Sequence, residues 1–133
     1  MSLHDPFDDE RSRLMPANKK YPLKDLFIVL KEYALKSNRK VVFEYILMKG
    51  VNDSEKHAEE LKKLLSTLPS KLNLIKYHGI TGGDFSPLSD GSSLKFYRYF
   101  SKTDFPVVFR SSRGEDIAAA CGQLSAEKKT GVQ

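Results

Sequence analysis

The hydrophobic pattern of the chain switches between a helical and a strand-like period. Apolar side chains recur at helical spacing over residues 23–34, and Pro22 suits a first helical position, so a helix is predicted to about Lys36. Residues 41–47 form a nearly continuous β-branched and aromatic run, which predicts a strand buried on both faces of a parallel sheet. Glu44 interrupts that run and should be paired, lie at the mouth of the sheet or line a polar cavity. A surface-directed glutamate is the alternative.

The alternation continues through the rest of the chain. Residues 50–54 are a turn ending in good N-cap residues, and apolar positions from Ala58 to Leu68 predict a helix that Pro69 stops. A strand over residues 72–77, a helix over residues 92–102 and a strand over residues 106–110 follow. This order predicts parallel strands joined by right-handed crossovers. Three full strands cannot close a barrel. We therefore expect an α/β fold, a partial (incomplete) βα barrel of three to four parallel strands with flanking helices.

The two ends of the chain look different from its middle. Residues 1–21 mix charges with two prolines, which predicts a loop with one helical turn near residues 8–14 and nothing that nucleates a core. This beginning suggests that the main body of the first element is absent. Residues 1–124 are expected to form one domain, and residues 125–133 a polar, disordered tail.

Composition narrows the setting. The 133 residues, 40% hydrophobic, suffice for one domain with a core. A net charge of +5 favours polyanionic partners such as RNA, although many domains carry such charge as a solvated face. The single cysteine, Cys121, excludes an internal disulfide and any multi-thiolate metal site made by this chain alone, so a reducing, cytoplasmic location is predicted and no metal ligand is assigned. No apolar run has the length of a signal peptide or membrane span, so no membrane partner is expected.

Candidate functional residues follow the carboxyl ends of the predicted strands, where binding loops of parallel sheets gather. The rule selects His4, residues 50–53, residues 78–84 and residues 110–121. Very small residues around Cys121 would let a large partner approach its sulfur, whereas the plainer interpretation is a small buried hydrophobe in a short helix. A conventional cysteine nucleophile would need His4, His57 or His78 near the thiol. His57 is expected to be a surface or capping residue.

Residues 113–124 (RGEDIAAACGQL) resemble the C-terminal signature of the radical S-adenosylmethionine enzymes that methylate C2 of an adenine in 23S rRNA and in some tRNAs. The related adenine-C8 methyltransferases share this signature. Further matches occur in the same order along the chain, at residues 2–4, Arg11, residues 16–21, residues 44–45, residues 50–54, residues 57–58 and residues 73–75.

The resemblance implies a mechanism and a set of site residues. The cysteine that Cys121 matches accepts a methyl group from one S-adenosylmethionine, giving an S-methylcysteine intermediate. A second S-adenosylmethionine, reduced by a 4Fe–4S cluster, activates that methyl group as a radical that adds to the adenine, and another cysteine resolves the resulting bridge. Ser2, Leu3 and His4 would line the S-adenosylmethionine site. His78 stands where the family usually has an asparagine that contacts the same molecule.

Departures from the family pattern define what this chain could supply. The three cluster cysteines (C-x3-C-x2-C) and the resolving cysteine are missing, so we interpret the chain as the C-terminal part of the catalytic domain, inactive by itself. Arg110 and Arg113 are candidates for contacts with phosphates or splayed bases of 23S rRNA or tRNA. The alternative for Arg113 is an ion pair with Asp116 that fixes the turn. A basic RNA- or nucleotide-binding α/β module without catalysis stays open, and the sequence predicts no oligomeric state.

Overall fold

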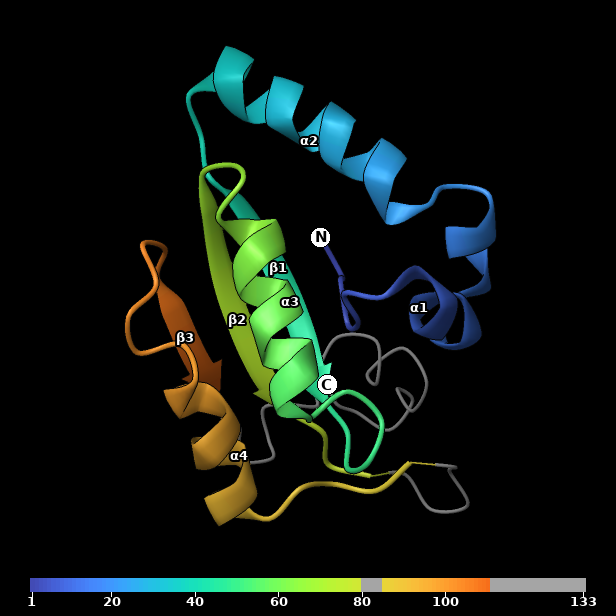
Figure 1. The fold of residues 1–133 in the computed structure, drawn as a ribbon, viewed down its shortest axis with the longest axis vertical. Coiled ribbons are helices and arrows are strands. Elements are labelled where there is room, and N and C mark those ends of the chain that lie inside the picture. The colour runs from blue at the N-terminus through green and yellow to red at the C-terminus, as the bar shows by residue number, and fades with distance from the viewer. Residues whose placement is uncertain (80–84, 111–133) are drawn as a thin grey trace, which may run out of the picture.

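The computed structural model describes residues 1–79 and 85–110 of the chain. Its elements, in chain order, are α1 (Asp8–Leu14), the 3-10 helix η1 (Pro16–Lys19), α2 (Leu23–Ser37), β1 (Val41–Leu47), α3 (Glu55–Leu65), β2 (Ser70–Lys76), α4 (Asp90–Arg98) and β3 (Val107–Arg110). The strands form one open sheet in the order β1-β2-β3 (Figure 1). No helix in the described ranges is long and apolar enough to cross a membrane.

All three strands are parallel, so their carboxyl ends meet at one edge of the sheet (Figure 1). Glu44 of β1 pairs with Asn73 of β2, and Asn73 pairs with Val108 of β3. On the other side of β1, Ser2 makes an isolated parallel bridge to Glu44. The expected α/β fold with an open sheet of parallel strands and flanking helices is therefore confirmed, with three strands in the described sheet.

In the described part of the chain, the core lies between the helices and one face of the sheet. Phe43 and Tyr45 of β1 are fully buried, and the Phe43 ring stacks on Phe27 of α2 at a centroid distance of 5.5 Å. Val42, which points the other way, is 40% exposed. The prediction that β1 is buried on both faces is thus wrong for the described residues, because buried and more exposed positions alternate along it. Glu44 lies half-buried on the less covered face.

The helices deviate from their predicted bounds for identifiable reasons. Pro22 precedes α2 as its N-cap, with an extended ψ of 161°, instead of forming the first helical residue. The expected cap of α3 is confirmed, since the Ser54 side chain accepts a hydrogen bond from the backbone N–H of His57. α4 begins before the predicted residue 92 because the Ser89 hydroxyl accepts from the N–H of Ser92. It ends before residue 102, where hydrogen bonds from residue i to residue i−3 replace the α-helical pattern.

The first residues are part of the core, contrary to expectation. Leu3 and Asp5 have no exposed surface, and α1 forms two turns of helix instead of one. The strand-like pairing of residue 2 with β1 carries Leu3 onto the helix-covered face of the sheet. A charged, proline-containing segment therefore contributes a buried anchor that its hydrophobic pattern did not indicate.

Candidate ligand site at the carboxyl edge of the sheet

The Ser-Leu-His segment (residues 2–4) is held along β1 by backbone hydrogen bonds. The N–H of Leu3 donates to the carbonyl oxygen of Glu44 at 2.8 Å, and the N–H of Glu44 donates to the carbonyl oxygen of Met1 at 2.8 Å. These bonds continue the parallel ladder by one more strand position. The segment thus leads Ser2, Leu3 and His4, the predicted cofactor-binding residues, toward the carboxyl edge of the sheet.

Arg11 fixes the segment from the side of α1. Its Nε donates to the carbonyl oxygen of Leu3 and its Nη2 donates to that of Ser2, each at 2.9 Å. Its Nη1 donates to Oδ1 of Asn18 at 2.6 Å. Burial lowers the pKa of Arg11, and the negative charges of Asp8 and Asp5 oppose this shift. The guanidinium group remains charged. This buried fork satisfies two carbonyl groups that the end of the ladder would leave unpaired.

Asn52 fixes the segment from the loop after β1. Its Nδ2 donates to the carbonyl oxygens of His4 and Ile46, both at 2.8 Å, and its Oδ1 accepts from the N–H of Met48 at 2.8 Å. The backbone carbonyl of Asn52 accepts from the Tyr45 hydroxyl at 2.8 Å. Because Asn52 is fully buried, one side chain joins the His4 loop and the β1 loop into one rigid unit.

His4 presents a defined tautomer at this edge. Its backbone has a φ of 59°, in the left-handed region, and its Nδ1 accepts from the backbone N–H of Ile46 at 3.0 Å. Nδ1 therefore carries the lone pair and the neutral ring carries its hydrogen on Nε2. Burial lowers the pKa of His4 to about 4, helped by the charges of Arg11 and the N-terminal ammonium group. At neutral pH the ring is an uncharged donor through Nε2.

The less covered face of the sheet carries a polar row. Ser2, Glu44 and Asn73 follow one another across three adjacent strand positions, and Val108 comes next. Asn73 is 8% exposed, and its Oδ1 is buried without a hydrogen-bond partner in the described part of the chain. A buried acceptor without a partner is costly, so this oxygen suits a ligand that brings an N–H or O–H donor.

The other predicted site residues are distributed as follows. His78 comes two residues after β2 and Arg110 ends β3, so both lie at the carboxyl edge, and both are exposed. Arg110 pairs in register with Ile75, which in turn pairs with Ile46, the residue bound to the His4 ring. His4 and Arg110 therefore share one row of the sheet, about 14 Å apart at the usual strand spacing. Cys121 and Arg113 lie outside the described residues, as does the predicted tail.

His57 was expected to be a surface or capping residue; it takes part in the N-cap of α3 but does not lie at the surface. It is 8% exposed, and besides its capping contact with Ser54 its Nε2 lies 2.7 Å from Oε1 of Glu10 and 3.5 Å from Oδ2 of Asp5. Burial lowers the pKa of His57, but the two carboxylates outweigh burial and raise the pKa above its ordinary value. Its ring therefore joins α3 to the segment that carries His4.

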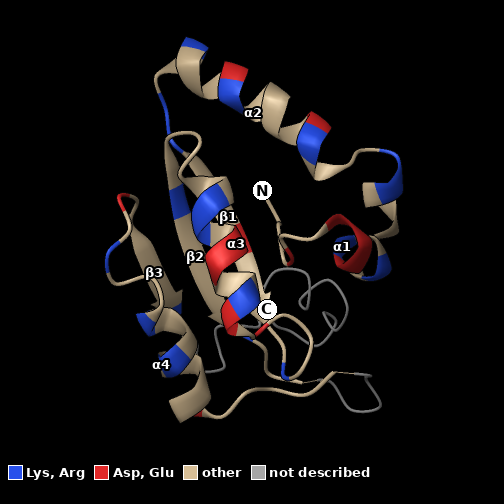
Figure 2. Cartoon of the chain, in the orientation of Figure 1, with Lys and Arg blue, Asp and Glu red and all other residues tan. Residues whose placement is uncertain are grey.

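Charged residues do not cluster at one site among the described residues. Lysine and arginine residues occur on α2, α3 and α4, and acidic residues alternate with them on α2 and α3, while the first turn of α1 is acidic (Figure 2). The described residues therefore form no single basic patch of the kind typical of nucleic-acid interfaces.

Sequence reasoning assigned no role to Arg11, Asn18 or Asn52. Arg11 belongs to a charged run that looks solvated, and its burial depends on carbonyl groups supplied by residues 2 and 3. Asn52 lies in a turn, where asparagine is common for local reasons. Two signals singled out these positions: the family resemblance, which included Arg11 and residues 16–21 and 50–54, and, for Asn52, the strand-end rule that selected residues 50–53.

The fold is that of the radical S-adenosylmethionine barrel proteins. A radical SAM methyltransferase from Sphaerobacter thermophilus aligns with a TM-score of 0.84 and 42% identity, over 92% of this chain and 36% of that chain. A domain of pyruvate-formate lyase-activating enzyme from Bacteroides vulgatus aligns with a TM-score of 0.64 over 83% of this chain and 65% of that chain; at 15% identity it supports the fold alone. No protein-family model matches the chain.

Curated relatives match nearly the whole of this chain. A probable dual-specificity RNA methyltransferase RlmN from Bacteroides fragilis is 43% identical over 129 residues, which are 97% of this chain and 38% of the relative. The dual-specificity RNA methyltransferase RlmN from Geobacter sulfurreducens is 44% identical over 93% of this chain and 34% of its own length. The chain is similar to these relatives over nearly its whole length, and it spans about a third of the length of each of them.

Proposed function

We propose that the chain is the C-terminal part of the catalytic domain of a radical S-adenosylmethionine RNA methyltransferase, with residues 1–124 in the domain and residues 125–133 as a tail. The reaction is methylation of C2 of an adenine in 23S rRNA and in tRNA, by way of a methyl group on Cys121. The observation that carries this proposal is the 41–44% identity to proteins named RNA methyltransferases over nearly the whole chain. The position of the Ser-Leu-His segment at the carboxyl edge agrees with it.

The residues at the edge fit S-adenosylmethionine. The molecule carries an amino group, a carboxylate and the exocyclic amine of adenine. A neutral His4 donating through Nε2 and the unpartnered Oδ1 of Asn73 offer one donor and one acceptor to such groups. Ser2, His4 and His78 are the residues we assign to this ligand, whereas the side chain of Leu3, predicted with them, is buried in the core. When bound, it supplies the methyl group, and the chain's own residues hold and orient it.

The 4Fe–4S cluster does not fit this chain. Such a cluster is held by several thiolates, and the sequence contains one cysteine. Its ligands must come from a part of the enzyme outside these residues, and we assign no step of the cluster's chemistry to this chain. Cys121 is the methyl acceptor in our proposal, and as a thiolate it attacks the methyl carbon of the sulfonium, whose sulfur leaves with the bonding electrons.

Methylation of Cys121 is the first test. The parent protein containing the cluster part is produced with iron and sulfide and purified without oxygen, and its peptides are analysed by mass spectrometry. The expected result is that the peptide with Cys121 gains the mass of one methylene group, and that Cys121→Ser abolishes the gain. An unmodified Cys121 in protein that binds both the cluster and S-adenosylmethionine would overturn the proposal. Analysis of the RNA product then separates C2 from C8 methylation.

RNA binding at the edge is tested with two arginines of similar exposure. Arg110 lies at the carboxyl edge, whereas Arg98 lies at the end of α4. We expect Arg110→Gln to weaken RNA binding by roughly tenfold and Arg98→Gln to leave it unchanged. Equal effects would contradict an RNA site at the edge. Arg113 is proposed as a second contact and is tested in the same way.

A binding module without catalysis is the second candidate, and the single cysteine favours it. It predicts RNA or nucleotide affinity that is the same in Cys121→Ser and no methyl group on any peptide. The mass measurement therefore distinguishes the two functions directly.

A further inference from the structure

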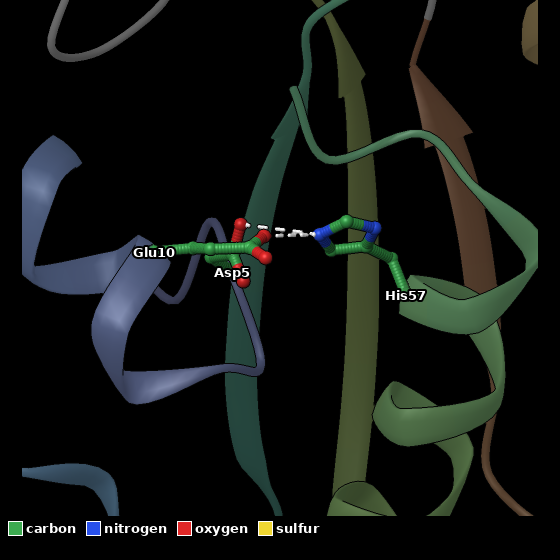
Figure 3. A group of neighbouring side chains, drawn as sticks. All are labelled: Asp5, Glu10 and His57. Atoms are coloured by element: carbon green, nitrogen blue, oxygen red, sulfur yellow. Dashed lines mark hydrogen bonds and ion pairs between the residues drawn. The ribbon is translucent and has the colours of Figure 1, made fainter. Parts of the chain in front are cut away.

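Asp5, Glu10 and His57 converge on one point from three segments (Figure 3). Asp5 follows the Ser-Leu-His segment, Glu10 lies in the first turn of α1, and His57 lies in the first turn of α3. One oxygen from each carboxylate and one ring nitrogen lie within 4.8 Å of one another. The described chain thus brings a nitrogen and two oxygens together from positions that are 5 residues (Asp5 and Glu10) and 47 residues (Glu10 and His57) apart.

Asp5 is the member of this cluster whose carboxylate lacks a full set of hydrogen bonds to the described residues. It has no exposed surface, and its Oδ1 accepts from the backbone N–H of Phe7 at 2.9 Å. Within residues 1–79 and 85–110, its Oδ2 is buried without a hydrogen-bond partner, although it points at His57 from 3.5 Å (Figure 3). The single hydrogen that Nε2 of His57 can carry is directed at Glu10, at 2.7 Å. The same N–H lies 3.5 Å from Oδ2 of Asp5, so its contact with Asp5 is weaker than its contact with Glu10, whereas a cation can bind both carboxylates closely.

The neighbouring cations do not fill this role. Arg11 is near enough for its charge to be felt by Asp5, but its three nitrogens donate to other oxygens, those of Leu3, Ser2 and Asn18. The Lys56 ammonium group lies over the ring of Phe7, 5.2 Å from its centroid. Among the described residues, the ion pairs of Asp5 and Glu10 are therefore with His57, and Arg13 lines the same cleft as Glu10 and His57.

The imidazole is oriented as a ligand would be. Nδ1 of His57 lies 2.7 Å from the Ser54 hydroxyl, which can accept a hydrogen from that nitrogen. In that tautomer Nε2 carries a lone pair directed at the carboxylates. Metal-binding histidines commonly donate their other N–H to such a partner, which fixes the ring. Glu10 and His57 also border a cleft of about 510 Å³ that Gly50 and Phe85 help to line, so water can reach this side.

We propose that Asp5, Glu10 and His57 bind one divalent transition-metal ion of the Zn²⁺ type, with a water molecule in the position that faces the cleft. Three protein ligands and one water is a common arrangement for Zn²⁺, and tetrahedral ligands at its usual bond lengths lie about 3.4 Å apart. The observed separations of 2.7 and 3.5 Å bracket that value. Glu10, whose side chain is 38% exposed, has room to adjust. Because one ligand is an imidazole, Mg²⁺ and Ca²⁺ are disfavoured.

Bound metal would connect the Ser-Leu-His segment, α1 and α3 at a point next to His4. The ion does not have to take part in methyl transfer, and the proposal does not rest on the proposed function. Its direct consequence is mechanical: the three segments that hold the edge become cross-linked through one centre, so loss of the ion should loosen the fold.

Zinc uptake by the full 133-residue chain tests the site. The protein is stripped with chelator, dialysed against Zn²⁺ and analysed for bound metal, and its thermal unfolding is followed with and without Zn²⁺. All samples carry Cys121→Ser, so that the thiol cannot account for binding. We expect one Zn²⁺ per chain and a rise in Tm of roughly 10 °C at 100 times the dissociation constant.

Matched variants decide which residues bind the ion. Asp5→Asn and Glu10→Gln should lower the zinc affinity at least about 100-fold, whereas Asp9→Asn, an exposed neighbour on α1, should bind as well as the parent. Circular dichroism shows whether Asp5→Asn folds. If it does not fold, Glu10→Gln still tests the site, because that side chain is half-exposed and its replacement disturbs the core less. The proposal is overturned if the parent retains no zinc, if its Tm ignores zinc, or if Asp5→Asn and Glu10→Gln bind like Asp9→Asn. Those results would leave an ion pair between His57 and the carboxylates.

Discussion

The amide of Asn52 donates a hydrogen bond to the backbone oxygen of His4, across 48 residues of sequence and a distance of 2.8 Å. The same amide binds Ile46, whose N–H holds the His4 ring. Position and tautomer of the histidine therefore depend on one buried side chain. This arrangement is typical of functional residues that are oriented by a shell of supporting contacts.

Replacing Asn52 should damage the fold far more than its position in a turn suggests. Asn52→Ala removes three buried side-chain hydrogen bonds and leaves their backbone partners unpaired, so we expect a loss of about 3 kcal/mol in the free energy of unfolding. Urea denaturation measures this loss. The control is Asn38→Gly, because Asn38 is exposed and has a φ of 57°, which glycine adopts without strain. A loss no larger than in the control would refute the role of Asn52.

Arg11 should not tolerate lysine. The three nitrogens of its planar fork donate to three different acceptors, whereas a lysine ammonium is a single point on a flexible stem. Arg11→Lys is expected to cost about 2 kcal/mol of stability. Arg13→Lys, an exposed change on the same helix, should stay within about 0.5 kcal/mol of the parent. Chemical denaturation of both variants gives the comparison, and equal stabilities would contradict it.

Leu3 should behave as a core residue. It is fully buried, so Leu3→Ala is expected to lower the free energy of unfolding by about 3 kcal/mol through lost burial and a cavity. Leu35→Ala makes the same chemical change at a position that is 81% exposed and should have an effect below about 0.5 kcal/mol. If Leu3→Ala were equally mild, the first residues would not be packed on the sheet in solution.

His4 should make the protein less stable in mild acid. The folded chain holds the pKa of His4 at about 4, below the value of about 6.5 for an unfolded histidine, so the unfolded state binds a proton first as the pH falls. The stabilisation is complete above about pH 6.5 and is lost as the pH falls toward 4, by about 3 kcal/mol in total. His4→Asn removes the titrating imidazole and therefore this part of the pH dependence, while it keeps a polar side chain at residue 4.

The protonation of His4 can also be observed directly. At about pH 6 the ¹⁵N chemical shifts of the ring should show a hydrogen on Nε2 and none on Nδ1, because the N–H of Ile46 occupies Nδ1. An imidazolium pattern at this pH would contradict both the tautomer and the lowered pKa.

Sequence predicted the repeating helices and strands well, because their side chains follow clear periods. It failed where tertiary contacts decide burial. Val42 and Phe43 have similar hydrophobicity, yet one faces the less covered side of the sheet and the other faces α2. No local pattern reports which face the helices cover.

In the candidate site, too, sequence predicted what the topology of the sheet determines and missed what tertiary packing determines. The position of His4, His78 and Arg110 at strand ends follows from the topology of parallel sheets, and the structure agrees on all three. The cluster of Asp5, Glu10 and His57 could not be foreseen, since it depends on how α1 packs beside α3. Asp5 is buried only because residues 2–4 pair with β1, a contact across more than 40 residues.

The parallel bridge between Ser2 and Glu44 also constrains the order of events as the chain folds. Residues 2–4 have no local partner in the sheet; their ladder bonds, the ring contact of His4 and the Asn52 amide come from residues 44–52. Contacts of such high sequence separation are slow to form, because a long loop must close first. During synthesis on a ribosome, residues 2–4 cannot take their places at the carboxyl edge of the sheet until Asn52 has left the exit tunnel.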